Sequence, residues 1–201
     1  MKEKVGAKLK KMASIIEEMV NLVYKGFMEN DAHYLDRALN KERVMDALER
    51  EITSSVVASS KTQPQEARKE LILLEQTAQN IERMGDELRG LMERIEIKIA
   101  EDLFFSDQGT AQYRQVFEKM KRSVELTVNF LNDKNPDTLT LIAQNGDQIK
   151  KLVEKYREEH FKRLTEGLCE ERAANMYFDM LDFTGNIARH CTNIARTHKV
   201  K

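Results

Sequence analysis

The sequence has few residues of the kinds that interrupt helices or build sheets. Its 201 residues include only 8 glycines and 2 prolines, and aromatic residues make up 6%. Methionine, leucine, glutamate, lysine and arginine dominate instead, a mixture that favours helices over strands. We therefore expect an all-α fold, and the length is sufficient for one domain or two small ones.

An excess of charge and a long apolar run are also missing. The 33 basic residues nearly balance the 34 acidic ones, so nucleic-acid binding has no electrostatic support. No apolar run reaches the roughly 18 residues of a membrane span, and Met1-Lys2-Glu3-Lys4 is not followed by an apolar signal core. Cys169 and Cys191 are 22 residues apart on one expected helix, too far for a disulfide. We expect a soluble, cytoplasmic protein with free thiols.

The apolar residues recur at helical spacing and predict six helices. Cap and turn signals at Asn30-Asp31, at Ser60 to Pro64 and at Asn135-Pro136 separate several of these helices. The expected helices cover residues 2–28, from the Asn30-Asp31 cap to 59, 64–103, 110–132, 136–164 and 168–198.

The second half of the sequence resembles the first. Asn135 follows Asn30 at a separation near 105, and Asn186-Ile187-Ala188-Arg189 follows the similar Asn80-Ile81-Glu82-Arg83 by 106 residues. A period of this length with three helices in each half predicts two three-helix bundles, related by a pseudo-twofold axis. We place them at residues 1–106 and 107–201.

Five acidic residues on the second and third expected helices predict a metal site. Glu42, Asp46 and Glu49 share one helix face by their spacing, and so do Glu82 and Asp86. The two helices should pack antiparallel with both acidic sets at the same height. No histidine accompanies them, which favours magnesium, manganese or an iron cluster over a structural zinc of the Cys/His type. Acids at this spacing are equally common on solvated faces, so an interaction module without metal is the alternative.

Gly85 lies within this acidic stretch and on the buried stripe of the third expected helix. Glycine inside a helix costs about 1 kcal/mol relative to alanine, so its presence predicts a close approach of two helices at this point.

These acidic stretches carry a resemblance to a known family. Asn80 to Asp86 resembles the ERIGD-type signature of the PhoU family, and Arg189 to Ala195 resembles the DHxxNIA continuation of that signature. Glu42 to Asp46 matches the family's E(D)xxxD motif in position, and the likeness spans residues 2–199. Tyr156 to His160, with Arg163, Leu164, Gly167 and Cys169, is similar to the PhoU-like cytoplasmic tails of bacterial sodium/phosphate cotransporters.

The resemblance implies two three-helix bundles with metal ions, or with multinuclear iron or zinc clusters, on the E(D)xxxD faces. It also implies a non-enzymatic regulator of phosphate uptake and phosphate homeostasis, which acts between a phosphate transporter component and a sensor kinase. Such a protein would reach the membrane only through its partners, and we expect it to form a homodimer. The alternative is a structural or membrane-surface helical interaction module.

The second half departs from the family pattern because its acidic pairs are missing. We therefore predict one metal site, in the first half, with Asp182 and Asn186 as a residual candidate in the second. His160 and His190 are expected at a surface or an interface rather than as ligands. A metal-dependent hydrolase is disfavoured, since no nucleophile and base or phosphate-binding glycine loop accompanies the acids. The positions that replace the acids are Gly146 and Lys150, and either Gly185 with Arg189 or Ala188 with Thr192.

Overall fold

The computed structural model describes residues 2–59 and 63–199, and six helices account for most of them. No strand occurs in these two ranges, so the all-α prediction is confirmed. The predicted break at residues 60–62 lies outside the described residues. The helices are α1 (Lys2–Glu29), α2 (Ala32–Ser59), α3 (Gln65–Ala100), α4 (Asp107–Asp133), α5 (Pro136–Thr165) and α6 (Glu171–Lys199).

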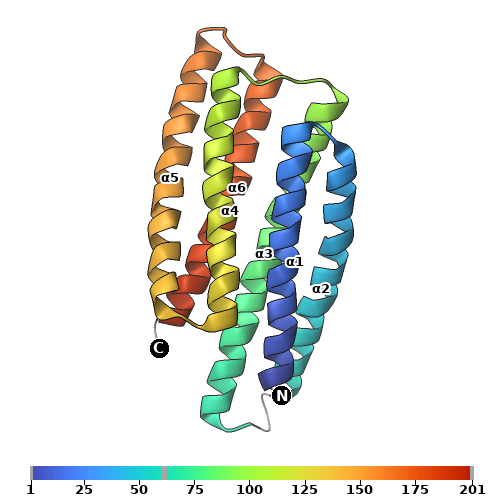
Figure 1. Ribbon diagram of the computed structural model, residues 1–201, viewed down its shortest axis with the longest axis vertical. Helices are drawn as coiled ribbons and strands as arrows, with labels where there is room; N and C mark the ends of the chain where they lie inside the picture. The colour runs from blue at the N-terminus through green and yellow to red at the C-terminus, as the bar shows by residue number, and fades with distance from the viewer. Residues whose placement is uncertain (1, 60–62, 200–201) are drawn as a thin grey trace.

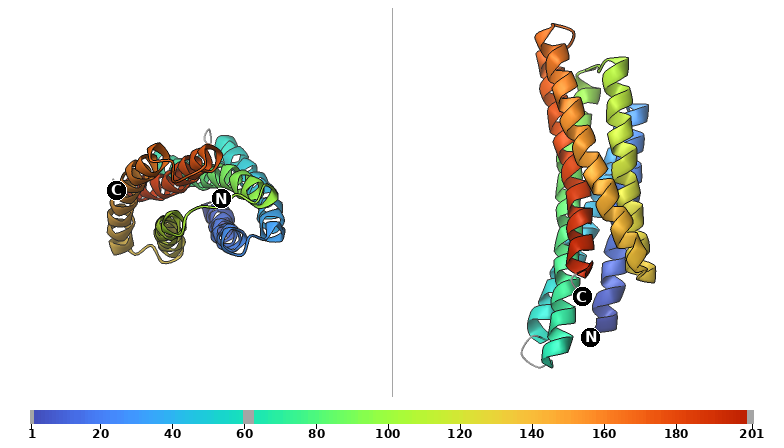
Figure 2. Two further views of the ribbon diagram at one scale, coloured as in Figure 1. Left: turned by 90° about the horizontal axis from the view of Figure 1, so that it is seen from above. Right: turned by 90° about the vertical axis from the view of Figure 1, so that its left-hand side faces the viewer.

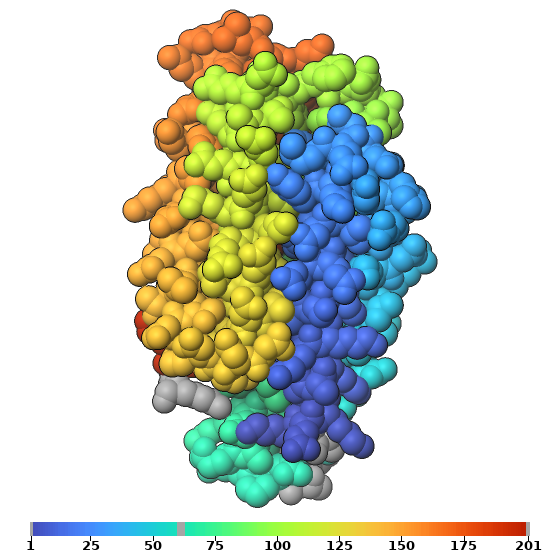
Figure 3. All heavy atoms as spheres, in the orientation of Figure 1, coloured from blue at the N-terminus to red at the C-terminus, as the bar shows by residue number. Residues whose placement is uncertain are grey.

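The helices form two bundles that lie side by side (Figure 1). α1, α2 and α3 pack together in one bundle, and α4, α5 and α6 pack together in the other. The bundles meet where α3 contacts α6 and α1 contacts α4, and all six helices run along the long axis (Figure 2). On the face drawn in Figure 3, the surfaces of α1 and α4 adjoin each other. The α2–α3 hairpin of the first bundle and the α5–α6 hairpin of the second each keep a face that points away from the rest of their bundle, which we call the outer face.

The two bundles share one apolar core. Aromatic side chains of three helices meet in it: the ring of Tyr113 on α4 lies 4.9 Å from that of Phe27 on α1 and 6.3 Å from that of Tyr177 on α6. The Tyr113 hydroxyl lies 3.0 Å from the hydroxyl of Thr184, so its polar atom is satisfied inside the core. The predicted boundary between residues 106 and 107 falls just before α4, and independent folding of each half stays a prediction.

Three helix ends differ from the predicted ones by three residues. α3 ends earlier because Asp102 is left-handed, with φ 52°, and the Leu103 N–H turns back to the Lys98 carbonyl at 3.0 Å. α4 begins earlier because the Ser106 hydroxyl accepts the N–H of its first turn at 3.1 Å. α6 begins later because Gly167, with φ 71°, ends α5 and leaves a short connection. Ser106 and Gly167 belong to residue types favoured at such helix ends, whereas Asp102 does not.

The cap residues support the internal repeat with a shift of one position. Asn30 and Lys134 are both left-handed, with φ 52° and 59°, and each ends the first helix of its bundle. Asp31 and Asn135 come next, and the side chain of each accepts the backbone N–H two residues later, at 2.9 and 3.0 Å. The structural counterpart of Asn135 is therefore Asp31 rather than Asn30.

None of the helices, as far as they are described, is both long and apolar enough to cross a bilayer.

Candidate metal centre

The predicted acidic residues come from the antiparallel helices α2 and α3. Glu42, Asp46 and Glu49 lie on α2, and Glu82 and Asp86 lie on α3. Between the two sets, the Met45 side chain of α2 lies against α3, since a Cβ added to Gly85 would lie 2.1 Å from Cε of Met45. The end of the Met45 side chain thus fills the space beside Gly85, and a close approach of the two backbones stays a prediction.

Four of the five carboxyl groups interact electrostatically. Burial raises the pKa of Glu82 to about 7, assisted by the charge and the hydrogen bond of Asp86 and by the charges of Glu49 and Asp46. Burial also raises the pKa of Asp46, and the charge of Asp86 adds to this effect. Glu49 accepts a hydrogen bond from the Thr53 hydroxyl at 2.8 Å. We refer to Asp46, Glu49, Glu82 and Asp86 as the acidic cluster.

Glu42 was expected beside the other four acids, but it does not belong to the acidic cluster. It is only 3% exposed and forms an ion pair with Arg89 of α3. The same guanidinium group lies 3.7 Å from a carboxylate oxygen of Asp86. Arg89 neutralises the buried Glu42 carboxylate, and this partner was missed in the sequence although it lies three residues after Asp86 on the same helix face.

The side chains of the acidic cluster are of the type that binds cations, but their positions do not form a set of metal ligands. Among the described residues, no three Asp, Glu, His or Cys side chains converge so that they could hold a metal ion. Yet four carboxyl groups share one patch, and burial, together with repulsion by the neighbouring acids, raises the pKa of Glu82 to about 7. Oxygen-preferring cations are ligated by such carboxylates, and a bound cation would take the place of the Glu82 proton. Binding therefore requires a change of side-chain rotamers within the acidic cluster.

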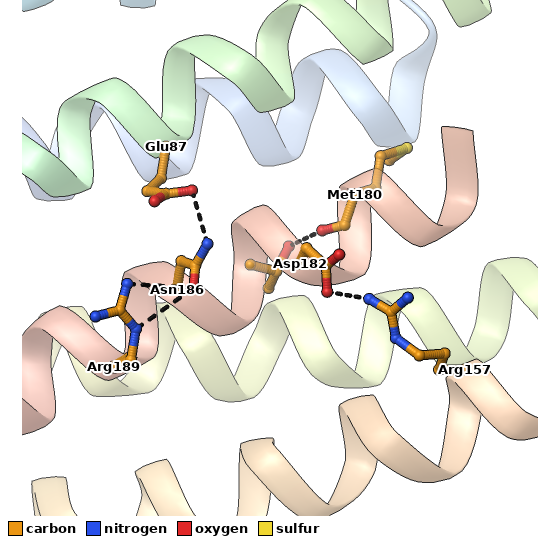
Figure 4. A network of polar contacts seen from close by, with 7 residues as sticks. Glu87, Arg157, Met180, Asp182, Asn186 and Arg189 are labelled. Atoms are coloured by element: carbon orange, nitrogen blue, oxygen red, sulfur yellow. Dashed lines mark hydrogen bonds and ion pairs between the residues drawn. The ribbon is translucent and has the colours of Figure 1, made fainter. Parts of the chain in front are cut away.

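On the corresponding face of the second bundle, Asp182 and Asn186 are each bound by an arginine side chain (Figure 4). Asp182 forms an ion pair with Arg157 of α5, so its carboxylate is already used. Asn186 donates a hydrogen bond to Oε2 of Glu87 on α3 at 3.2 Å and accepts two from the Arg189 guanidinium, at 3.3 and 3.4 Å. The residual candidate pair Asp182 and Asn186 is thus divided between separate partners.

The two histidines lie away from the acidic cluster in buried positions. Nδ1 of His190 is 3.1 Å from Oδ1 of Asn80, at the contact between α6 and α3, as predicted for an interface residue. His160 was expected at a surface or an interface, but it is only 4% exposed and stacks on Tyr177 with ring centroids 4.2 Å apart. Burial, with a smaller contribution from nearby arginines, lowers the pKa of both imidazoles to about 4. Both are neutral at physiological pH.

The two cysteines are free, as predicted. Cys191 is buried in the core, and burial raises the pKa of its thiol to about 12. Such a thiol remains protonated and is a packing residue rather than a nucleophile or a metal ligand.

Comparison with known proteins relates this geometry to a family. Residues 9–95 match the family model of the PhoU domain. The structure of PhoU from Pseudomonas aeruginosa superposes with a TM-score of 0.90 at 18% identity, covering 98% of this chain and 94% of that chain. The phosphate transport system regulatory protein PhoU from Streptococcus pneumoniae gives 0.86 at 13% identity, with 98% and 92% covered.

A more distant solved structure has the same topology. A PhoU-like protein from Shewanella oneidensis matches with a TM-score of 0.70 at 12% identity, covering 97% of each chain. No curated protein sequence matches the chain. The narrower likeness to cotransporter tails stays a prediction. The family resemblance of the sequence is confirmed: the chain carries a PhoU domain in its first bundle and has the fold of PhoU proteins over both bundles.

Proposed function

We propose that this protein is a PhoU-type regulator of phosphate transport that binds a metal ion at the acidic cluster. The observation that carries the regulatory role is the similarity of fold, which extends over 98% of the chain to a protein named as a phosphate transport system regulator. The role is exerted through protein contacts and needs no catalytic step. The partners are a transporter component and a sensor kinase, met in the cytoplasm at the membrane surface, and the protein acts as a homodimer.

The metal ion belongs to the first bundle in this proposal. Asp46, Glu49, Glu82 and Asp86 supply the oxygen ligands, and Arg89, which also borders Asp86, compensates the charge of the buried Glu42 carboxylate. Iron or zinc is the ion that the family resemblance suggests, whereas oxygen ligands also suit magnesium or manganese. The bound ion would cancel the repulsion within the acidic cluster and so fix the outer face of the α2–α3 hairpin for a partner.

Elemental analysis of the purified protein tests the metal site. Wild-type protein, dialysed after incubation with iron, zinc, manganese or magnesium, should retain one of these metals. The Glu82→Ala/Asp86→Ala variant should retain none while its helical circular dichroism is unchanged. The matched control Glu93→Ala/Glu96→Ala removes two exposed acids from the same helix, outside the acidic cluster, and should retain the metal. Stoichiometric metal in the first variant would reject the site.

A gene deletion tests the regulatory role separately. Phosphate uptake by the deletion strain should become insensitive to the phosphate supply, and the wild-type gene should restore its control. Unchanged uptake under both rich and starved conditions would contradict the role. A strain carrying Glu82→Ala/Asp86→Ala then shows whether regulation depends on the acidic cluster.

An interaction module without metal is the second candidate function, and exposed apolar residues at one end of the molecule favour it. Phe104 in the α3–α4 connection, Phe161 near the end of α5 and Leu168 in the α5–α6 connection are 73%, 59% and 66% exposed. Exposed apolar side chains near each other are typical of contact surfaces. This function predicts that no variant of the acidic cluster alters regulation, whereas Phe104→Ser/Phe161→Ser does.

A further inference from the structure

The outer face of the second bundle contains a groove between α5 and α6. Its volume is about 480 Å³, and both helices contribute its lining. Four basic side chains lie along it, Lys150 and Arg157 from α5 and Arg189 and Arg196 from α6, together with three acids. The groove includes the positions where the internal repeat would have placed acidic ligands, and its chemistry is opposite to that of the acidic cluster.

Two of the basic groups in the groove already have acidic partners. Arg157 forms an ion pair with Asp182, and Lys150 lies 3.9 Å from a carboxylate oxygen of Glu154. Within the described residues, by contrast, no carboxylate forms an ion pair with Arg189 or Arg196. Arg189 donates only to the neutral amide oxygen of Asn186 in Figure 4, and Asp147, the third acid, is exposed on the groove wall. The charge of Arg189 acts on the nearby Glu87 carboxylate, but neither guanidinium group is held in an ion pair by the residues that the structure describes, so both can turn to an anion in the groove.

The groove also has an apolar part. Gly146 and Gly185 carry no side chains into it, and Val153 is the apolar side chain of its lining. The lack of a side chain at Gly146 is required by packing, since a Cβ there would lie 2.3 Å from Oγ1 of Thr192. At Gly185 a Cβ would only make an ordinary contact, 3.5 Å from Val153. A ligand with an uncharged body can therefore lie against α5 and α6 while its charged end meets the arginines.

We propose that this groove binds an organic phosphate of nucleotide size. Guanidinium groups hold phosphoryl oxygens through paired, charge-assisted hydrogen bonds. Arg189 and Arg196 lie on the same face of α6, about two turns apart, so both can reach one ligand in the groove. The volume falls within the range of about 300–1,000 Å³ that small-molecule sites occupy, and inorganic phosphate would leave most of it to water. The proposal concerns a different face from the metal site and does not depend on it.

Calorimetric titration of the full chain with AMP, and separately with inorganic phosphate, tests the groove. AMP should bind saturably and at least about tenfold more tightly than inorganic phosphate. Arg189→Gln/Arg196→Gln should weaken AMP binding by about tenfold or more, because it removes both guanidinium groups that hold the phosphoryl oxygens. Gly185→Leu, which fills the groove without changing any charge, should weaken it as well.

Adjacent lysines on α5 provide the matched control. Lys150 lines the groove whereas Lys151 is exposed and does not, so Lys150→Glu should weaken AMP binding and Lys151→Glu should leave it within twofold. Equal losses in these two variants would show that only net charge matters and would overturn the site. Saturable binding to neither probe, or inorganic phosphate binding as tightly as AMP, would also overturn the proposal. Loss of the metal site in Glu82→Ala/Asp86→Ala should leave AMP binding unchanged.

Discussion

The outer faces of the two bundles are built alike and carry opposite charge. Both are formed by a pair of antiparallel helices in which a side chain packs against a glycine, Met45 against Gly85 in the first bundle and Thr192 against Gly146 in the second. In the first, burial raises the pKa of Asp46 and of Glu82, and the charges of neighbouring acids add to this effect. In the second, the equivalent region is a groove with four basic side chains. The packing of the repeat has been retained while its chemistry has diverged.

This difference limits what a shared fold implies about function. A superposition over 98% of the chain fixes where the helices lie, yet the identity is 18%. A site made of side chains on an outer face is free to change without disturbing the core beneath it. Each face therefore has to be interpreted from its own residues, and the predictions below test the two faces against each other.

The contact between the bundles should give the largest effect on stability. A Cβ added to Gly90 of α3 would lie 2.6 Å from the ring of Phe183 on α6. Gly90→Val should therefore push α3 away from α6 at the contact between the two bundles. We expect a loss of about 1–3 kcal/mol in the free energy of unfolding, measured by urea denaturation. Gly6→Val on α1 is the control, because no atom lies within 4 Å of a Cβ there, and it should change stability by a few tenths of a kcal/mol at most. Equal effects of the two substitutions would contradict the tight α3–α6 contact.

The helices and the acidic stripe could be predicted from the sequence because both follow from the helical period. Apolar residues on one face require burial, and acids at i and i+4 share a face whatever surrounds them. Of the three misplaced helix ends, only that of α3 lacks a distinctive signature, because Asp102 takes up a left-handed conformation that glycine or asparagine more often supplies. Ser106 is a favoured N-cap residue, and its position before α4 was visible in the sequence.

The partners within the site could not be predicted in the same way. Spacing gives the face of each helix, but the rotation of α2 against α3 decides which side chains meet. Glu42 has the same spacing as the other acids and yet is buried against Arg89. The sequence shows Lys150 and Arg189 at positions that replace the acids, but their spacing does not show that α5 and α6 leave a groove between them.

The pH dependence of stability should distinguish the two bundles. The pKa of Glu82 is raised from 4.5 to about 7, so the folded state binds the extra proton and loses stability as the pH rises from about 4.5 to 7. The pKa values of His160 and His190 are lowered from 6.5 to about 4, so the unfolded state binds the extra protons and stability rises with pH over about 4 to 6.5. The two contributions have opposite sign.

Glu82→Gln removes only the first contribution. In the presence of a chelator, the Tm of this variant should exceed that of the wild type at pH 8 by about 2 °C, a modest gain because solvent screens a half-buried group. At pH 4.5 the two Tm values should coincide, since Glu82 is protonated there in the folded protein. A constant Tm difference at both pH values would show that Gln acts through packing rather than through the carboxylate charge. The rise in stability between pH 4 and 6.5 should remain in the variant.

Removing one carboxylate charge from each face should give small effects of opposite sign. Asp182→Asn breaks the exposed ion pair with Arg157 and should cost about 0.5 kcal/mol, whereas Asp86→Asn relieves the repulsion on Glu82 and Asp46 and should stabilise the metal-free protein by a similar amount. Urea denaturation at pH 8 in low salt measures both changes. At about 1 M salt, where the screening length falls to roughly 3 Å, both should diminish, because each is a charge effect at the surface. Destabilisation by Asp86→Asn would mean that the attraction between Asp86 and Arg89, 3.7 Å apart, outweighs the repulsion between Asp86 and the neighbouring acids. The first face would then resemble the second, because arginine would hold its acids and they would not be presented to a cation.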